Sequence, residues 1–132
     1  MDNTQTASVN RFQEQFGLPS DRARTKVRDH MEPPVQEFIQ NAPFAVLATS
    51  NAGGGCDASP KGGKPGFVRI LDARPLLLPD VAGNRLFQSY ENIDRNPHVG
   101  LIFFIPGLNN TVRVNGSARV VDRDELERRD LE

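Results

Sequence analysis

Apolar and polar residues alternate most clearly over residues 111–121, where Val112, Val114, Ala118 and Val120 stand between polar neighbours. Strict alternation predicts a strand with one face on a core and the other in water. Apolar runs bounded by Gly, Pro or Asn predict further strands. We expect six strands in all, over residues 44–50, near 57–60, and over 67–71, 75–78, 99–105 and 111–121.

Helical patterns occupy the first forty residues. Residues 9–16 predict a short helix that ends at Gly17, and Ser20 is placed to cap a second one. Apolar residues of that second helix recur at intervals of four: Ala23, Val27 and Met31. Pro33 and Pro34 break it, and Pro34 suits the first turn of a third helix that carries Val35, Phe38 and Ile39.

Two more helices follow the first strands. One spans residues 85–95, presents Leu86, Phe87, Tyr90 and Ile93 as its apolar positions, and ends before Pro97. The last begins at Asp122, with Glu125 completing an acidic capping box. One helix inserted after the fourth of six short strands predicts a mainly β, α+β fold built on a small six-stranded antiparallel barrel.

We expect three parts along the chain: a helical arm over 1–42, the barrel over 43–121 and a C-terminal helix over 122–132. A chain of 132 residues has room for one hydrophobic core. The net charge of −1 gives no support to a nucleic-acid or anionic-membrane partner.

Cys56 is the single cysteine, so no intrachain disulfide can form, and a reducing compartment is indicated. The N-terminus lacks the basic start and apolar core of a secretion signal. The longest apolar run, 101–105, is far shorter than the roughly 20 residues that span a bilayer. We therefore expect a cytoplasmic protein.

Several kinds of site are excluded by spacing. Six glycines at positions 53–55, 62, 63 and 66 match neither the Walker pattern nor the dinucleotide fingerprint, so we interpret most of them as hairpin turns. His30, His98 and Cys56 do not have metal-ligand spacing, and we expect no metal. Ser117 lacks the flanking glycines of a nucleophile elbow, and no acid–base catalyst can be named.

The most informative stretch is residues 76–87, in which three leucines predict a buried strand that Pro79 and Asp80 end. Asn84 is a good helix cap and Arg85 opens the next helix. Amide donors at a helix start beside a cation suit an anion, and a phosphate is the obvious candidate. The alternative is an ordinary loop with a solvated arginine.

Two other polar pairs could join such a site: Ser59 with Lys61 after the second strand begins, and Thr111 with Arg113 on the sixth. Cations, hydroxyls and helix amides together suit a phosphomonoester. Each residue taken alone is an ordinary surface residue. They gain weight only where the fold brings them into one cleft.

The chain resembles the pyridoxamine 5′-phosphate oxidase-related FMN-binding split-barrel proteins over about residues 38–121. Within that family it is most similar to a branch whose members are named only as FMN-dependent enzymes of this class. The residues that carry the resemblance are, in order, Phe44-Ala45-Val46-Leu47-Ala48-Thr49-Ser50, Ala58-Ser59-Pro60-Lys61-Gly62, Pro65-Gly66-Phe67-Val68, Pro79-Asp80 with Gly83-Asn84-Arg85, Asn96-Pro97-His98-Val99-Gly100-Leu101, and Arg113-Val114-Asn115-Gly116. The resemblance implies a six-stranded split barrel and a homodimer with two FMN sites between its subunits.

The resemblance also implies roles for residues. Arg85 matches the arginine that grips the FMN phosphate, and Asn84 a polar neighbour. Leu78 and Pro79 match the strand end that lies along the flavin ring. Ser59 and Lys61 match, more loosely, a segment that contacts ribityl and phosphate. Thr111 stands in place of a flavin-contacting glutamine with Arg113 two residues beyond, and we expect both to come from the second chain.

The resemblance has a limit at the C-terminus. The oxidase's pyridoxal-phosphate-binding residues lie in a segment beyond Glu132, so vitamin B6 oxidation is unsupported. We expect either a truncated chain or one that ends in a cloning remnant at Leu131-Glu132. The predicted function is an FMN-binding oxidoreductase with an unknown substrate and electron partner. The alternatives are a non-catalytic flavin-binding or sensing protein, a deazaflavin-dependent reductase, and a plain dimeric structural module.

Overall fold

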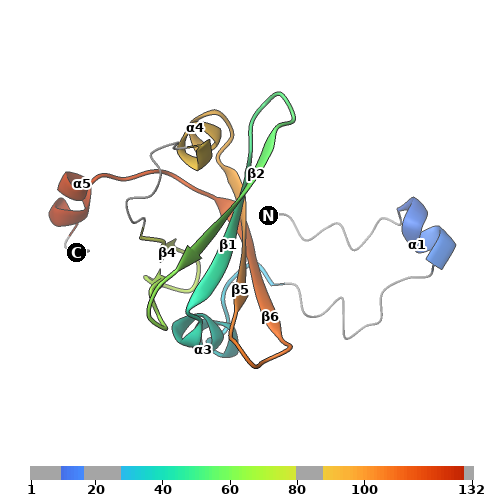
Figure 1. The fold of residues 1–132 in the computed structure, drawn as a ribbon, viewed down its shortest axis with the longest axis horizontal. Coiled ribbons are helices and arrows are strands. Elements are labelled where there is room, and N and C mark those ends of the chain that lie inside the picture. Colours follow the sequence, from blue (N-terminus) through green and yellow to red (C-terminus); the bar gives the residue numbers. More distant parts are fainter. Residues whose placement is uncertain (1–9, 17–27, 80–87, 130–132) are drawn as a thin grey trace.

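The structure is a computed structural model that describes residues 10–16, 28–79 and 88–129. Its main feature is a four-stranded antiparallel sheet in the order β2-β1-β5-β6 (Figure 1). The strands are β1 (Phe44–Ser50), β2 (Cys56–Gly62), β5 (His98–Phe104) and β6 (Thr111–Ser117). A second antiparallel sheet pairs β3 (Arg69–Ile70) with β4 (Leu76–Leu77).

One face of the four-stranded sheet, here called the inner face, builds the hydrophobic core. Ala45 and Leu47 of β1 lie opposite Phe103 and Leu101 of β5, and all four are buried. Residues directly opposite each other share a face, so alternation assigns every second residue of each strand to this side. The core is completed by Met31, Ile39, Ala42 and Val68.

The helices within the described residues are α1 (Arg11–Phe16), α3 (Pro33–Asn41), α4 (Gln88–Arg95) and α5 (Arg123–Arg128). Figure 1 shows α3 and α4 at opposite ends of the long strands, while α1 and α5 lie away from the sheet on opposite sides. The helix α3 buries Ile39 in the core and begins with two prolines, which suit a first turn because its amides have no partner inside the helix. Among the described helices, α3 and α4 are therefore the two that lie against the sheets.

The turn between β1 and β2 closes on itself. The amide of Asn51 donates to the carbonyl of Gly55 at 2.8 Å, and the Asn51 side-chain Oδ1 accepts from the amides of Gly53 and Gly55 at 2.9 Å each. Gly54 has a φ of +93°, a conformation that glycine adopts without steric cost. The prediction that these glycines form a hairpin turn is confirmed.

Residues 28–32 are attached to the β3–β4 turn. The Met31 amide donates to the Ala73 carbonyl at 2.6 Å. Asp29 accepts hydrogen bonds from His30 at 2.9 Å and from Arg74 at 3.1 Å. The hydrogen bond from His30 is the larger cause, and the charge of Arg74 the next, of a pKa of the Asp29 carboxyl below its usual value. Met31 was expected at the end of the second helix. That prediction is wrong, because Met31 is not helical and its amide is hydrogen-bonded to the Ala73 carbonyl. The rest of that helix lies outside the described residues.

The predicted strands are present, but three of them are shorter than predicted. The third and fourth are two residues each, since Leu71 and Asp72 both donate to the Pro75 carbonyl and turn the chain. The sixth ends at Ser117 instead of residue 121, because its partner strand begins at His98 and the preceding Pro97 has no amide to extend the ladder. Val120 is consequently exposed, against expectation.

The remaining helix predictions agree with the described residues. The helix α5 starts after Asp122, whose Oδ1 accepts from the Glu125 amide at 2.8 Å, so the predicted cap is confirmed. The fold is thus α+β with a mainly antiparallel sheet. Two statements stay predictions: that all six strands close into one barrel, and that the chain divides into a helical arm, a barrel and a C-terminal helix at residues 42/43 and 121/122.

Phe103 provides a test of the inner face. Its side chain is fully buried, and we expect Phe103→Ala to lower the free energy of unfolding by about 3–5 kcal/mol through lost burial and the cavity left behind. The neighbouring Phe104 is half-buried on the other face, so Phe104→Ala is the control and should cost less. Urea unfolding followed by circular dichroism measures both. Equal losses would contradict the assignment of faces.

Candidate functional site

The edge strand β2 carries polar residues on its inner face. Asp57, Ser59 and Lys61 lie opposite Thr49, Leu47 and Ala45, so all three share the face of the core, and each is half-buried. Successive members of this row are about 6.8 Å apart, the two-residue repeat of a strand. The row therefore presents a carboxylate, a hydroxyl and an ammonium group in that order.

The expected ring-contacting residues lie at the end of β4. Leu78 is half-buried and packs against the hydrophobic core, whereas Pro79 is exposed and is the last described residue before the gap. The expected phosphate-binding pair, Asn84 and Arg85, lies outside the described residues. For these two positions the roles stay predictions from the sequence.

Thr111 and Arg113 occupy the other side of the sheet. They lie opposite Phe104 and Ile102, which point away from the core, and both are exposed. We call this side the outer face. The two expected pairs thus lie on opposite faces, and also on opposite edges, because β2 and β6 are separated by three interstrand steps, or roughly 14 Å. A single chain does not bring Ser59 and Lys61 together with Arg113.

The helix α4 is attached to the strand ends by side-chain hydrogen bonds. Asn92 Nδ2 donates to Thr49 Oγ1 at 2.9 Å, and both residues are buried. Ser89 Oγ donates to Asp57 Oδ2 at 3.1 Å, and Nδ2 of Asn96, the residue after the end of α4, donates to Ser50 Oγ at 3.0 Å. Helix and strands are thus joined at three points.

This polar face was not predicted from the sequence. The apolar Tyr90 and Ile93 were expected to face the protein, but these are half-buried, while Ser89 and Asn92 are the buried pair. The signal was present, since residues 89, 92 and 96 follow the i, i+3, i+7 spacing of one helix face. Polar side chains at that spacing do not by themselves predict a buried face, because their burial depends on hydrogen-bond partners on strands that are distant in sequence.

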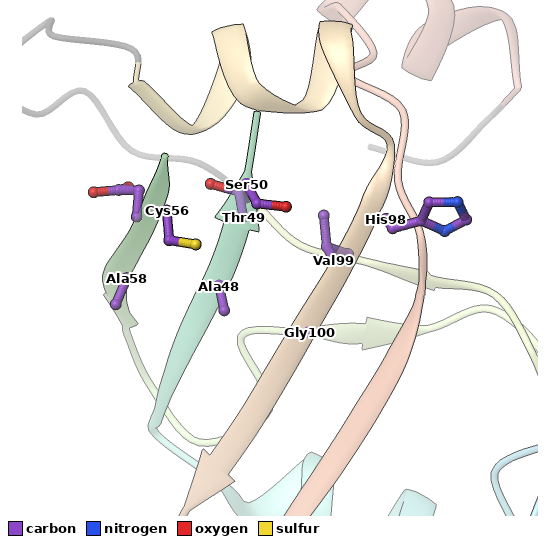
Figure 2. Close-up of a pocket in the computed structure, with 9 residues that line it drawn as sticks. Ala48, Thr49, Ser50, Cys56, Ala58, His98, Val99 and Gly100 are labelled. Atoms are coloured by element: carbon purple, nitrogen blue, oxygen red, sulfur yellow. The ribbon is translucent and has the colours of Figure 1, made fainter. Parts of the chain in front are cut away.

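A pocket of about 550 Å³ opens beside α4, where β1, β2 and β5 approach it (Figure 2). Much of its floor is a row of small residues on the outer face, Ala58, Ala48 and Gly100, which the strand registers place side by side. Of the expected cofactor contacts within the described residues, none lines it. The other lining residues are Thr49, Ser50, Cys56, Asp57, His98 and Val99.

Cys56 and His98 do not form a catalytic pair in this pocket. The strand β1 lies between them, which separates their backbones by roughly 10 Å, and Figure 2 shows the imidazole pointing away from the thiol. The Cys56 thiol instead faces the Gly54 carbonyl, with 3.8 Å between Sγ and O. A thiol is activated by an adjacent base, and this arrangement does not provide His98 as one.

Two features of the described residues bear on the class of site. In that part of the chain, no three His, Cys, Asp or Glu side chains are grouped so that they could hold a metal ion. Likewise, none of the helices there has the length and apolarity needed to cross a bilayer.

Comparison with known proteins now assigns the family. The family model described as pyridoxamine 5′-phosphate oxidase matches residues 31–131, which include every strand of the structure. The chain belongs to the pyridoxamine 5′-phosphate oxidase family. The resemblance inferred from the sequence motifs is thereby confirmed. No curated protein matches the chain.

Among solved structures, this family member is similar to a crystal structure of a HupZ variant from Group A Streptococcus. The two share 21% sequence identity with a TM-score of 0.45. The match covers 58% of each chain, so this chain corresponds to little more than half the length of that protein.

The donor set on β2 fits the polar part of a flavin nucleotide. Lys61 brings a cation suited to a phosphate dianion, and Ser59, one two-residue step away on the same face, brings a hydroxyl suited to ribityl oxygens. The half-buried Leu78 adds an apolar surface beside the core. The residue types present here therefore fit the chemistry of FMN.

Asn92 tests the attachment of α4. Removing its side chain leaves the buried Thr49 hydroxyl without this donor, so we expect Asn92→Ala to lower the free energy of unfolding by about 1–3 kcal/mol. Glu91→Ala, at an exposed position of the same helix, is the control and should stay within about 0.5 kcal/mol of the wild type. Urea denaturation measures both, and a neutral Asn92→Ala would contradict the attachment.

Proposed function

We propose that this protein is an FMN-binding flavoprotein, acting as a homodimer with two FMN sites between its subunits, and that it supports oxidoreductase chemistry on a small molecule. Membership of the pyridoxamine 5′-phosphate oxidase family supports the cofactor. The observation that carries the proposal is the division of the expected contacts between two faces and two edges of one sheet.

A two-chain site explains that division. Ser59 and Lys61 on the inner side of one edge cannot contact the same ligand as Arg113 on the outer side of the other edge within one chain. A second copy removes the conflict, because its β6 can approach the first copy's cleft from outside. In a twofold dimer each chain contributes its β6 to the site of the other chain, so two equivalent sites form, as isologous symmetry requires.

The outer face provides the apolar surface that such a dimer needs. Phe44, Val46, Ile102 and Phe104 lie in two adjacent rows across β1 and β5, with Phe44 39% exposed and the other three half-buried. The rings of Phe44 and Phe104 are in contact, with centroids 5.9 Å apart. Contiguous apolar side chains rimmed by polar ones are typical of interaction surfaces, and here Thr111 and Arg113 form the rim on one side.

The roles of the residues follow from their chemistry. Bound FMN would supply hydride or single-electron transfer through its ring. Lys61 and Arg85 would neutralise the phosphate, Asn84 and Ser59 would hydrogen-bond the phosphate and ribityl oxygens, and Leu78 and Pro79 would lie along the ring. Thr111 and Arg113 of the second copy would close the cleft. Substrate specificity is a property of the open part of that cleft, since one fold hosts many chemistries.

Binding of FMN and the role of Arg85 form one test. Purified protein should bind FMN stoichiometrically with a change in flavin fluorescence, and Arg85→Ala should weaken binding by about 1.5–3 kcal/mol, the cost of a lost hydrogen bond to a charged group. Arg95→Ala, in an exposed arginine at the far end of α4, is the control and should leave affinity unchanged.

The outcomes of that titration separate the alternatives. Protein without affinity for FMN contradicts the proposal. Tighter binding of a deazaflavin in direct competition favours a deazaflavin-dependent reductase. Stoichiometric FMN binding without turnover of reduced nicotinamides or electron acceptors favours a sensing role.

The dimer surface is tested by placing a charge on the outer face. Ile102→Glu buries a carboxylate in the proposed interface, so we expect a monomer by sedimentation velocity and at least a tenfold loss of FMN affinity. Val120→Glu replaces an apolar residue that is 45% exposed and lies outside the strands, and it should leave both properties unchanged. A dimeric Ile102→Glu variant with normal FMN binding would contradict the two-chain site.

A further inference from the structure

The strand β2 lacks the attachment that holds its neighbours. The strands β1 and β5 each bury two apolar residues in the core, and β6 packs Val112 and Val114 against it. No residue of β2 belongs to the core or packs against it as an apolar neighbour. As an edge strand, β2 is also hydrogen-bonded to β1 alone in the described sheet. Its inner face therefore needs another contact to hold it in place.

The hydrogen bond between Ser89 and Asp57 provides that contact. Ser89 is only 8% exposed, Asp57 is half-buried, and 3.1 Å separates Oγ from Oδ2. The other two side-chain links from α4, through Asn92 and Asn96, end on β1. The bond from Ser89 joins the helix to the polar row of β2.

We propose that Asp57 is a positioning residue, which holds β2 to α4 through Ser89 and so fixes Ser59 and Lys61 for the phosphate end of a flavin nucleotide. This inference rests on the proposed function. Asp57 precedes Ser59 by one two-residue step on the same face, so a displacement of its backbone is passed along the strand to both ligand-binding positions.

The charge of Asp57 has a separate effect from its hydrogen bond. A carboxylate at one end of the row and an ammonium group at the other disfavour a phosphate beside Asp57 and favour one beside Lys61. Asp57→Asn removes the charge but keeps an oxygen that can accept from Ser89. Asp57→Ala removes both. The two substitutions thus separate repulsion from positioning.

The experiment compares FMN with riboflavin, which lacks the phosphate. Positioning of Lys61 matters for FMN alone, so Asp57→Ala and Ser89→Ala should each lower the ratio of FMN to riboflavin affinity by roughly three- to tenfold. Asp57→Asn should keep the ratio at or above the wild-type value. Asn96→Ala, which removes the link from α4 to Ser50, is the matched control and should lower stability without changing the ratio.

Amide hydrogen exchange provides a second readout on protein without ligand. Exchange over residues 57–62 should accelerate in Asp57→Ala and Ser89→Ala, while exchange over β5 should not. Ser89→Ala is the milder variant and serves where Asp57→Ala does not fold.

The results distinguish failure of this inference from failure of the proposed function. Wild-type protein that does not bind FMN overturns both. Wild-type protein that binds FMN, together with an unchanged ratio in Asp57→Ala and Ser89→Ala, overturns the positioning role alone. An equal fall of the ratio in Asn96→Ala also overturns it, because general loosening of α4 would then explain the effect.

Discussion

The pairing of β1 with a strand on each side is the constraint on which the rest of the structure depends. Its ladders with β2 and β5 fix which residues lie opposite one another, and alternation then assigns each side chain to a face. A shift of one residue in either ladder would move Leu47 or Leu101 out of the core. The same registers place Ser59 and Lys61 inward on one edge, and Thr111 and Arg113 outward on the other. The proposal of a site shared by two chains rests on this geometry and not on any single side chain.

The attachment of α4 shows a different physical solution from that of α3. The helix α3 inserts Ile39 into the core, an interaction that depends on area and tolerates small shifts. The helix α4 instead uses Ser89, Asn92 and Asn96, whose hydrogen bonds have defined lengths and directions. Buried polar contacts contribute little net stability when satisfied but are costly when broken, so they select one helix position over its neighbours. Such accuracy is of use where a helix lies beside a binding cleft.

Much of the fold could be predicted from the sequence, because long apolar stretches and turn residues agree. The strands over 44–50, 98–104 and 111–117 and the helix cap at Asp122 are local signals, read correctly to within a few residues. The end of β6 could not be predicted, since it depends on where β5 begins, and Met31 was misplaced because its partner Ala73 is distant in sequence. The family was recognisable from ordered motifs. The polar face of α4 and the separation of the expected site residues were not, because both arise from the sheet order.

The self-closing turn at Asn51 has a consequence for how the chain folds. Only five residues separate β1 from β2, whereas 47 separate β1 from β5. Loop closure over a short, internally bonded turn carries a small entropic cost, so the β1–β2 hairpin is suited to nucleate the sheet. The pairing of β5 with β1 closes a much longer loop, so we expect it to form more slowly than the hairpin.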